Sequence, residues 1–122
     1  MENHLVKITE TTALDDLVER SRQGPIVIFK HSLTCPISAN AFRQMNNYEG
    51  EVALVEVQRA RALSNEIENR LGIRHESPQV IVLRNGQVVW DASHFRITSD
   101  AVADAVSKAH SETREAAGGG ND

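Results

Sequence analysis

The sequence predicts a single α/β domain, in which a mixed five-stranded sheet carries helices on both faces. Strand and helix patterns alternate along most of the chain, and helical crossovers between the early strands imply that those strands run parallel. Asn85 and Gly86 give a two-residue turn signal, which forces the last two strands to run antiparallel. With 122 residues, the chain is long enough to bury one core without disulfides or a metal ion.

Five segments have the apolar content of β-strands. The second is a continuous apolar run that begins at Ile26, which is typical of a strand buried on both faces. Pro78 introduces the fourth, and the turn at Asn85 and Gly86 joins it to the fifth. The expected strands are residues 5–8, 26–30, 51–57, 79–83 and 87–91.

Apolar residues at helical spacing lie between and after these strands. The four predicted helices run through Leu14, Leu17 and Val18, through Ile37, Ala41 and Met45, over residues 62–71, and through Val102 and Val106. Gly72 ends the third helix, and Thr98 or Ser99 caps the fourth. Residues 115–122 are polar and glycine-rich, so we expect a domain over residues 1–114 followed by a disordered tail.

Charge and cysteine content restrict the class of protein. The formal net charge is -4 and no cluster of Lys and Arg offsets it, so we expect no nucleic-acid partner. No apolar run is long enough to span a membrane, and the first residues lack the basic start and apolar core of a signal peptide. One cysteine cannot form an internal disulfide and suits a reducing compartment. We therefore expect a cytoplasmic monomer without membrane association, which oxidation can link into a dimer through Cys35.

Cys35 follows the central strand after a short polar turn. Thr34 can cap a helix, and Pro36 is tolerated only where the backbone N–H has no helical partner, so Cys35 is expected on the first turn of a helix. The positive end of the helix dipole favours thiolate over thiol there. The thiolate is the reactive form, and Cys35 is therefore the candidate nucleophile, partly exposed and with a pKa below that of a free cysteine.

Three stretches resemble one known family over nearly the whole chain. They are FKHSLTCPIS around Cys35, LSNEIENRLGIRHESPQVIVLRNGQVVW, and the DASHFRIT that follows. Together they are similar to the monothiol bacilliredoxins, which belong to the thioredoxin-like superfamily. The resemblance implies a thioredoxin-like fold and thiol exchange with bacillithiol, a low-molecular-weight thiol of some bacteria. A mixed disulfide between bacillithiol and a client protein would be attacked, and the bacillithiol would move onto Cys35. Bacillithiol would then be a co-substrate, with no bound cofactor.

Ser38 stands where a Cys-x-x-Cys motif has its second cysteine. A serine cannot resolve a mixed disulfide, so Cys35 must pass its partner to another thiol. Ser38 lies about one helical turn beyond Cys35, where its hydroxyl can donate a hydrogen bond to the thiolate. An alternative remains open: Thr34 and Ser38 are only a helix cap and a polar surface residue.

The resemblance also implies a rim around the thiol. It makes a cis peptide bond before Pro78 the expectation, although an ordinary trans strand opener is the alternative. Ser77, Pro78 and residues 92–94 should then surround Cys35. Ser93 and His94 are expected to bind carboxylates of the small thiol, with His94 adding charge when it is protonated.

Other polar residues give weaker signals. His31 can lend positive charge to the thiolate, but the sequence favours a solvated loop residue. A cation for an anionic thiol ligand can come from Lys30, Arg43, Arg59 or Arg74, but each is better explained as a residue that decorates the end of a helix or strand. The spacing of histidines, Cys35 and carboxylates predicts no metal site.

Two functions remain. The first is a monothiol oxidoreductase that removes bacillithiol from oxidised proteins. The second is a non-catalytic thioredoxin-fold module that binds a partner beside Pro78 and whose Cys35 is merely modified under stress, because a lone cysteine is usually a small hydrophobe. The pKa and alkylation rate of Cys35 distinguish the two functions.

Overall fold

A computed structural model describes residues 4–119 of the chain, with side chains described for residues 4–110. The strands are β1 (Leu5–Lys7), β2 (Ile26–His31), β3 (Val52–Glu56), β4 (Gln79–Arg84) and β5 (Gln87–Ser93). The helices are α1 (Thr12–Arg20), α2 (Pro36–Asn47), α3 (Arg61–Leu71) and α4 (Ser99–Gly119), with a 3-10 turn, η1 (His94–Arg96), before α4.

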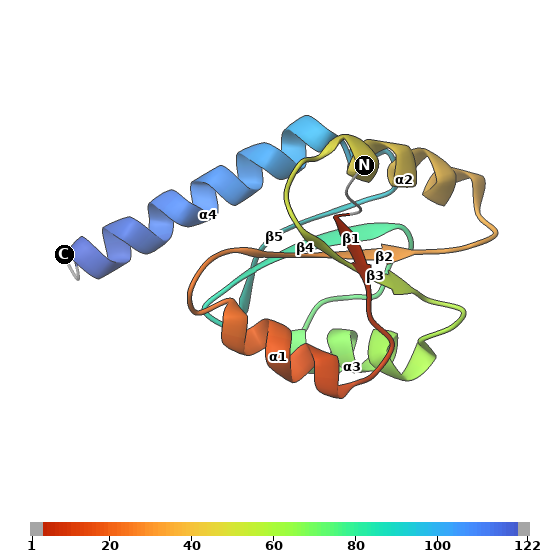
Figure 1. Ribbon diagram of the computed structural model, residues 1–122, viewed down its shortest axis with the longest axis horizontal. Coiled ribbons are helices and arrows are strands. Elements are labelled where there is room, and N and C mark those ends of the chain that lie inside the picture. Colours follow the sequence, from red (N-terminus) through yellow and green to blue (C-terminus); the bar gives the residue numbers. More distant parts are fainter. Residues whose placement is uncertain (1–3, 120–122) are drawn as a thin grey trace.

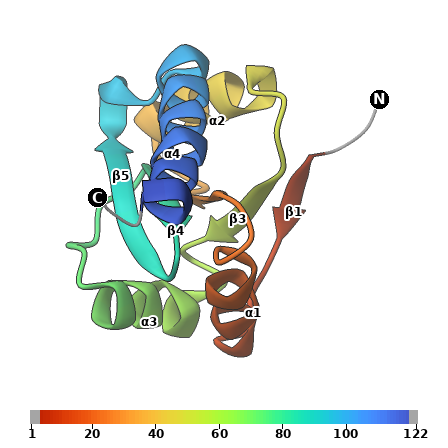
Figure 2. The same ribbon diagram turned by 90° about the vertical axis from the view of Figure 1, so that its left-hand side faces the viewer.

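The five strands form one mixed sheet in the order β1-β3-β2-β4-β5. β3 pairs in parallel with both β1 and β2, whereas β4 is antiparallel to β2 and to β5. Helices α2 and α4 cover one face of the sheet, and α1 and α3 cover the other (Figures 1 and 2). The predicted α/β architecture, with helices on both faces of a mixed sheet, is confirmed.

β2 lies between two separate apolar cores. Phe29 belongs to the core under α2 and α4, and Ile28 belongs to the core under α1 and α3. Both side chains are fully buried, as the continuous apolar run predicted. Because side chains alternate along a strand, Lys30 follows Ile28 onto the α3 face and His31 follows Phe29 onto the α2 face.

The hairpin turn between β4 and β5 is also as predicted. Asn85 and Gly86 have φ values of 55° and 76°, the left-handed backbone that a two-residue turn of this kind requires. Ser21, at the end of α1, holds this turn: its carbonyl accepts the Asn85 N–H at 2.8 Å and its Oγ accepts the Gly86 N–H at 2.8 Å. The turn therefore closes the end of the sheet against α1.

The start of α4 shows which of Thr98 and Ser99 caps this helix. The Oγ1 of Thr98 accepts the N–H of Ala101 at 3.1 Å, so Thr98 is the cap. The backbone of α4 continues through Gly119, which overlaps the segment 115–122 that was expected to be disordered. Residues 120–122 lie outside the described residues, and the boundary at residue 114 stays a prediction.

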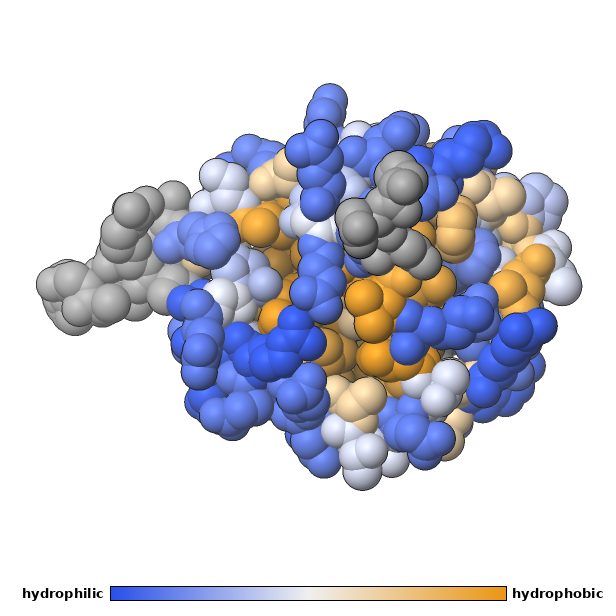
Figure 3. Space-filling view, in the orientation of Figure 1, coloured by the Kyte–Doolittle hydropathy of each residue, from blue (hydrophilic) through white to orange (hydrophobic). Residues whose placement is uncertain are grey.

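The edge strand β1 is partly exposed on one face of the molecule. Figure 3 shows a mostly hydrophilic face with apolar surface gathered in its middle, where β1 lies in Figure 1. Val6 of β1 is 46% exposed. Over the part of the chain that the structure describes, no helix combines the length and the hydropathy needed to cross a membrane.

Candidate active site

Cys35 is the N-cap residue of α2. Its φ of −98° and ψ of 126° are extended, and Pro36 occupies the first helical position. Thr34 was expected to cap this helix, and that expectation was wrong by one residue. Proline disfavours the helical conformation for the residue before it, so Cys35 takes the extended cap position itself.

The hydrogen bonds at the start of α2 favour the thiolate of Cys35. The pKa of Cys35 is lowered, first by the backbone N–H of Ser38 and then by that of Ile37. Burial acts in the opposite direction, and the Ser38 hydroxyl adds a lowering effect smaller than that of burial. Cys35 is partly exposed, so a reagent can reach the sulfur. This partial exposure is as expected, and the hydrogen bonds at the start of α2 shift the pKa of Cys35 in the expected direction.

Ser38 is fully buried and its hydroxyl is oriented by the loop before α2. The N–H of Ser32 donates to its Oγ at 3.2 Å. Because a hydroxyl has one proton and that contact uses an acceptor lone pair, the proton remains available to the Cys35 thiolate. Ser38 is therefore a partner of the sulfur and not a polar surface residue.

Gln58 holds the loop between β2 and Cys35. Its Oε1 accepts the N–H of Leu33 at 3.0 Å, and its Nε2 donates to the Oγ of Ser32 at 2.9 Å and to the Oγ1 of Thr34 at 3.4 Å. The place of Thr34 is thus set by Gln58 and not by a helix-capping bond. Gln58 was not predicted from the sequence, because a polar residue after a strand carries no signal for a contact with a loop more than twenty residues earlier in the chain.

A cavity of about 380 Å³ opens beside the sulfur on the α2 face. Its lining residues are His31, Ser32, Leu33, Cys35, Ala39, Phe42 and Glu56. His31 was expected to be a solvated loop residue, and this is wrong: it is the last residue of β2 and only 9% exposed. The strand continues one residue further than predicted, and the imidazole packs 4.9 Å from the Phe42 ring and 5.5 Å from the Phe29 ring, measured between centroids.

The loop before β4 lies at the same end of the sheet as the Cys35 loop. The Ser77–Pro78 peptide bond is cis, as the resemblance implied, and Pro78 is buried. Gln79 pairs with Lys30 of β2 on one side and with Ser93 of β5 on the other. One residue further out, the N–H of His94 donates to the carbonyl of Pro78 at 3.1 Å.

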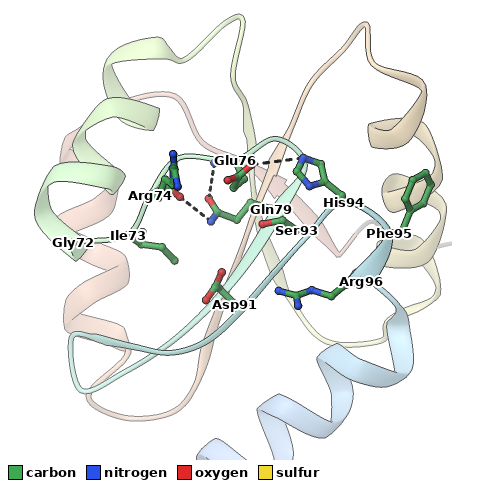
Figure 4. Close-up of a pocket in the computed structure, with 10 residues that line it drawn as sticks. All are labelled: Gly72, Ile73, Arg74, Glu76, Gln79, Asp91, Ser93, His94, Phe95 and Arg96. Atoms are coloured by element: carbon green, nitrogen blue, oxygen red, sulfur yellow. Dashed lines mark hydrogen bonds and ion pairs between the residues drawn. The ribbon is translucent and has the colours of Figure 1, made fainter.

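Ser93 and His94 line a second cavity, of about 690 Å³, on the α3 face. In Figure 4, His94 and Glu76 point toward one another, with Gln79 and Ser93 beside them; the His94 Nε2 lies 3.6 Å from the Glu76 Oε1. The other lining residues are Gly72, Ile73, Arg74, Asp91, Phe95 and Arg96. Ser93 and His94 are thus at the same end of the sheet as Cys35 but in a different cavity, and their contact with its ligand stays a prediction.

Known proteins place this site in a family. Residues 6–102 match the family model of the monothiol bacilliredoxin BrxC. The chain belongs to the monothiol bacilliredoxin family. The family resemblance predicted from the sequence is confirmed, and with it a thiol redox function for a chain whose single cysteine begins α2.

Solved structures show that this bacilliredoxin has a thioredoxin fold. A structure described as a putative oxidoreductase with a thioredoxin fold is 32% identical, with a TM-score of 0.76, over 83% of this chain and 92% of that one. Thioredoxin from Fasciola hepatica has a TM-score of 0.68 at 14% identity, over 85% of this chain and 98% of that one. The Schistosoma mansoni thioredoxin pre-protein has a TM-score of 0.64 at 16% identity, over 87% and 98%. The last two show the fold alone.

Lys30 is a second unusual ionisable group in this bacilliredoxin. It was expected to lie at a solvated strand end, but its side chain is fully buried and its Nζ makes no hydrogen bond to the described residues. Burial lowers the pKa of Lys30 to about 8, although the charges of Glu68 and Glu76 act to raise it. Within the described residues, no group of three or more His, Cys, Asp and Glu side chains is placed to hold a metal ion.

Proposed function

We propose that this bacilliredoxin removes bacillithiol from S-bacillithiolated client proteins, with Cys35 as the nucleophile. The observation that supports this is the partly exposed Cys35, whose thiolate is favoured by the N–H groups and hydroxyl at the start of α2. The Cys35 thiolate attacks the bacillithiol sulfur of the mixed disulfide, and the client cysteine leaves as a thiolate. Ser38 stands where a resolving cysteine would be, so a thiol from outside the chain must resolve the mixed disulfide. In this proposal a second bacillithiol does so, and the two leave as bacillithiol disulfide.

The small thiol is recognised, in this proposal, by residues at the ends of β4 and β5. Ser77 has a buried hydroxyl without a hydrogen-bond partner among the described residues, next to the buried Pro78. Ser93 and His94 line a cavity that also holds Arg74 and Arg96, whose charges attract carboxylates. Ser38 tunes the nucleophile, and Thr34 helps to place the loop before it.

The remaining parts of the proposal concern partners and place of action. Bacillithiol acts as a thiol co-substrate and no cofactor is bound. The chain works as a cytoplasmic monomer, and oxidation without bacillithiol links two copies through Cys35. Neither nucleic acid nor a membrane takes part.

A matched pair of variants tests the reaction. A client protein carrying bacillithiol is mixed with the wild-type chain, Cys35→Ala or Ser38→Ala, and released bacillithiol is measured by mass spectrometry. Cys35→Ala should release none, because exchange needs a sulfur nucleophile, whereas Ser38→Ala should keep measurable activity. Release by the Cys35→Ala variant at the wild-type rate would disprove the enzyme function.

The competing function is a non-catalytic module with an ordinary cysteine. Alkylation of Cys35 by iodoacetamide between pH 5 and 10 separates the two. The lowered pKa of Cys35 predicts a midpoint below about 8.5, the value of a free cysteine. A midpoint at or above that value would favour the module.

A further inference from the structure

The cavity beside Cys35 is lined by a histidine, His31, to which the proposed exchange assigns no role. Three of its lining residues are ionisable: Cys35, His31 and Glu56. His31 and Glu56 are each only 9% exposed, and they stand directly opposite one another in the pairing of β2 with β3. A group bound to the sulfur in this cavity therefore meets an imidazole that is held in place by Phe29 and Phe42.

The hydrogen bonding of His31 leaves it able to take up a proton. Its Nδ1 is buried and makes no hydrogen bond with any described residue, so no such bond fixes the tautomer of the ring. Burial lowers the pKa of His31, which keeps the ring neutral near pH 7, and the Glu56 charge acts in the opposite direction. The Oε1 of Glu56 also lacks a hydrogen bond, so a carboxylate is at hand when the ring becomes charged.

The other charged groups around this pair lie on its solvent side. Lys7 of β1 is 3.6 Å from Glu56 Oε2, and Arg59 is 3.7 Å from Glu56 Oε1. Both are bound to Glu56 and more than half exposed, so they hold the carboxylate without entering the cavity at Cys35. Phe42, which α2 contributes, is not ionisable.

A protein with one cysteine has a particular need for a base. In a two-cysteine protein the second thiol resolves the mixed disulfide, but here an outside thiol must do so, and its thiolate is the attacking form. A thiol with a pKa of about 8.5 is only about 3% ionised at pH 7, so removing its proton can accelerate the attack by at most about 30-fold.

From this geometry we infer that His31 is the catalytic base that accepts the proton of the small thiol resolving the Cys35 mixed disulfide. The inference rests on the proposed function. The proton of the incoming thiol moves to the imidazole, and a new S–S bond forms between the two small thiols. The bond to Cys35 breaks with its electron pair left on Cys35 as the thiolate. The sulfur of the incoming thiol is thereby oxidised and the sulfur of Cys35 is reduced, while the small thiol that was already bound stays at the disulfide level. The imidazolium later returns its proton to water.

A single-turnover experiment tests the base. Cys35 is first loaded with bacillithiol as a mixed disulfide, and the rate of its release by free bacillithiol is followed from pH 6 to pH 10. The variants are His31→Gln and His31→Phe, the second of which keeps an aromatic ring between Phe29 and Phe42. His110→Gln, on the exposed side of α4, is the matched control.

Both His31 variants should resolve the disulfide about ten-fold more slowly at pH 7 and approach the wild-type rate above about pH 9.5, where the thiol ionises unaided. The control should follow the wild-type curve. Equal rates at pH 7 would overturn the inference. A deficit of the same size at every pH would also overturn it, because it would indicate a structural role.

A second attacking thiol tests whether the thiol proton is what His31 accepts. The 2-nitro-5-thiobenzoate anion carries no thiol proton at pH 7, so the His31 variants should react with it at the wild-type rate. A ten-fold loss of rate with this anion would contradict the inference.

The carboxylate of Glu56 provides a further test. Glu56→Gln should move the low-pH limb of the bacillithiol rate profile to lower pH, because it removes the charge that raises the pKa of His31.

The loading step distinguishes failure of the proposed function from failure of the role of His31. If the wild-type chain takes no bacillithiol from a client protein, the proposed function fails. If the wild-type chain loads and the His31 variants resolve as fast as it does, only the role of His31 fails.

Discussion

Cys35 and Lys30 lie at opposite sides of the same end of the sheet, and both have a lowered pKa. At Cys35 the cause is a set of hydrogen bonds to the sulfur, which stabilise the charged form. At Lys30 the cause is burial, which penalises the charged form. The shift at Cys35 favours the reactive thiolate, and the shift at Lys30 disfavours the protonated amine.

The difference shows that the cause of a pKa shift carries more information than its direction. Cys35 is partly exposed at a helix start and opens to a cavity, as a nucleophile must. Lys30 is enclosed under α3, with Glu68 and Glu76 as the charges that partly compensate it. The environment of Cys35 suits a nucleophile, whereas the burial of Lys30 predicts a cost to stability.

The largest expected effect comes from removing the charge at Lys30. Lys30→Met keeps most of the side-chain volume and should raise the free energy of unfolding at pH 7 by about 2–3 kcal/mol, because a pKa of about 8 in place of 10.5 reflects a penalty on the buried charge. Urea denaturation measures it. Lys108→Met, at an exposed site on α4, is the control and should change the free energy by less than about 0.5 kcal/mol. A loss of stability in Lys30→Met would show that the attraction of the Lys30 charge to Glu68 and Glu76 outweighs burial.

The lowered pKa of Lys30 also predicts how the stability of the chain depends on pH. The unfolded chain keeps the Lys30 proton up to about pH 10.5, but the folded chain releases it from about pH 8. Between these values the unfolded state binds more protons, so the wild-type chain gains stability as pH rises. The advantage of Lys30→Met should therefore be full below pH 8 and disappear toward pH 10.5. A constant advantage across that range would contradict the burial of a charged amine.

A smaller effect is expected at the sulfur. Ser38→Ala removes the hydroxyl but leaves the backbone N–H groups of Ile37 and Ser38, which are the larger causes of the shift. The pKa of Cys35 should rise, and iodoacetamide should alkylate it about two- to five-fold more slowly at pH 6. At a pH well above that pKa the rates should converge. An unchanged rate at pH 6 would mean that the hydroxyl does not bind the thiolate.

The smallest expected effect concerns the loop that carries the nucleophile. Gln58→Ala removes three hydrogen bonds at an exposed site and should lower the free energy of unfolding by about 0.5–1 kcal/mol. The Leu33 amide should also exchange its hydrogen faster. Gln87→Ala, another exposed glutamine, provides the control. Unchanged exchange at Leu33 would show that the loop keeps its shape without Gln58.

The sequence predicted the parts of this fold that depend on local pattern. The turn at Asn85 and Gly86, the helix after Cys35 and the buried strand at Ile26 each depend on a few neighbouring residues, and all three are present. The cap at Cys35 was missed by one residue, since helix ends are the least certain part of such a prediction.

The errors at the site have a common physical origin. The surroundings of Gln58, His31 and Lys30 come from parts of the chain that are distant in sequence. Gln58 binds the loop of Ser32, His31 packs on the ring of Phe42, and Lys30 is buried, with Glu68 as a compensating charge. Strand alternation assigns His31 and Lys30 to opposite faces, but only the packed helices decide that each face is covered. A charged residue at a strand end is usually solvated, so burial at Lys30 could not be expected from the sequence.

The serine at position 38 also determines how the reaction responds to the cell. A second cysteine one turn away would attack at an effective concentration far above that of any free thiol, and the sulfur would be released at a constant rate. With Ser38 in that place, every disulfide formed at Cys35 joins it to another molecule. Its lifetime is then inversely proportional to the concentration of the thiols outside, so the fraction of chains held as the mixed disulfide reports how much reducing thiol the surroundings contain.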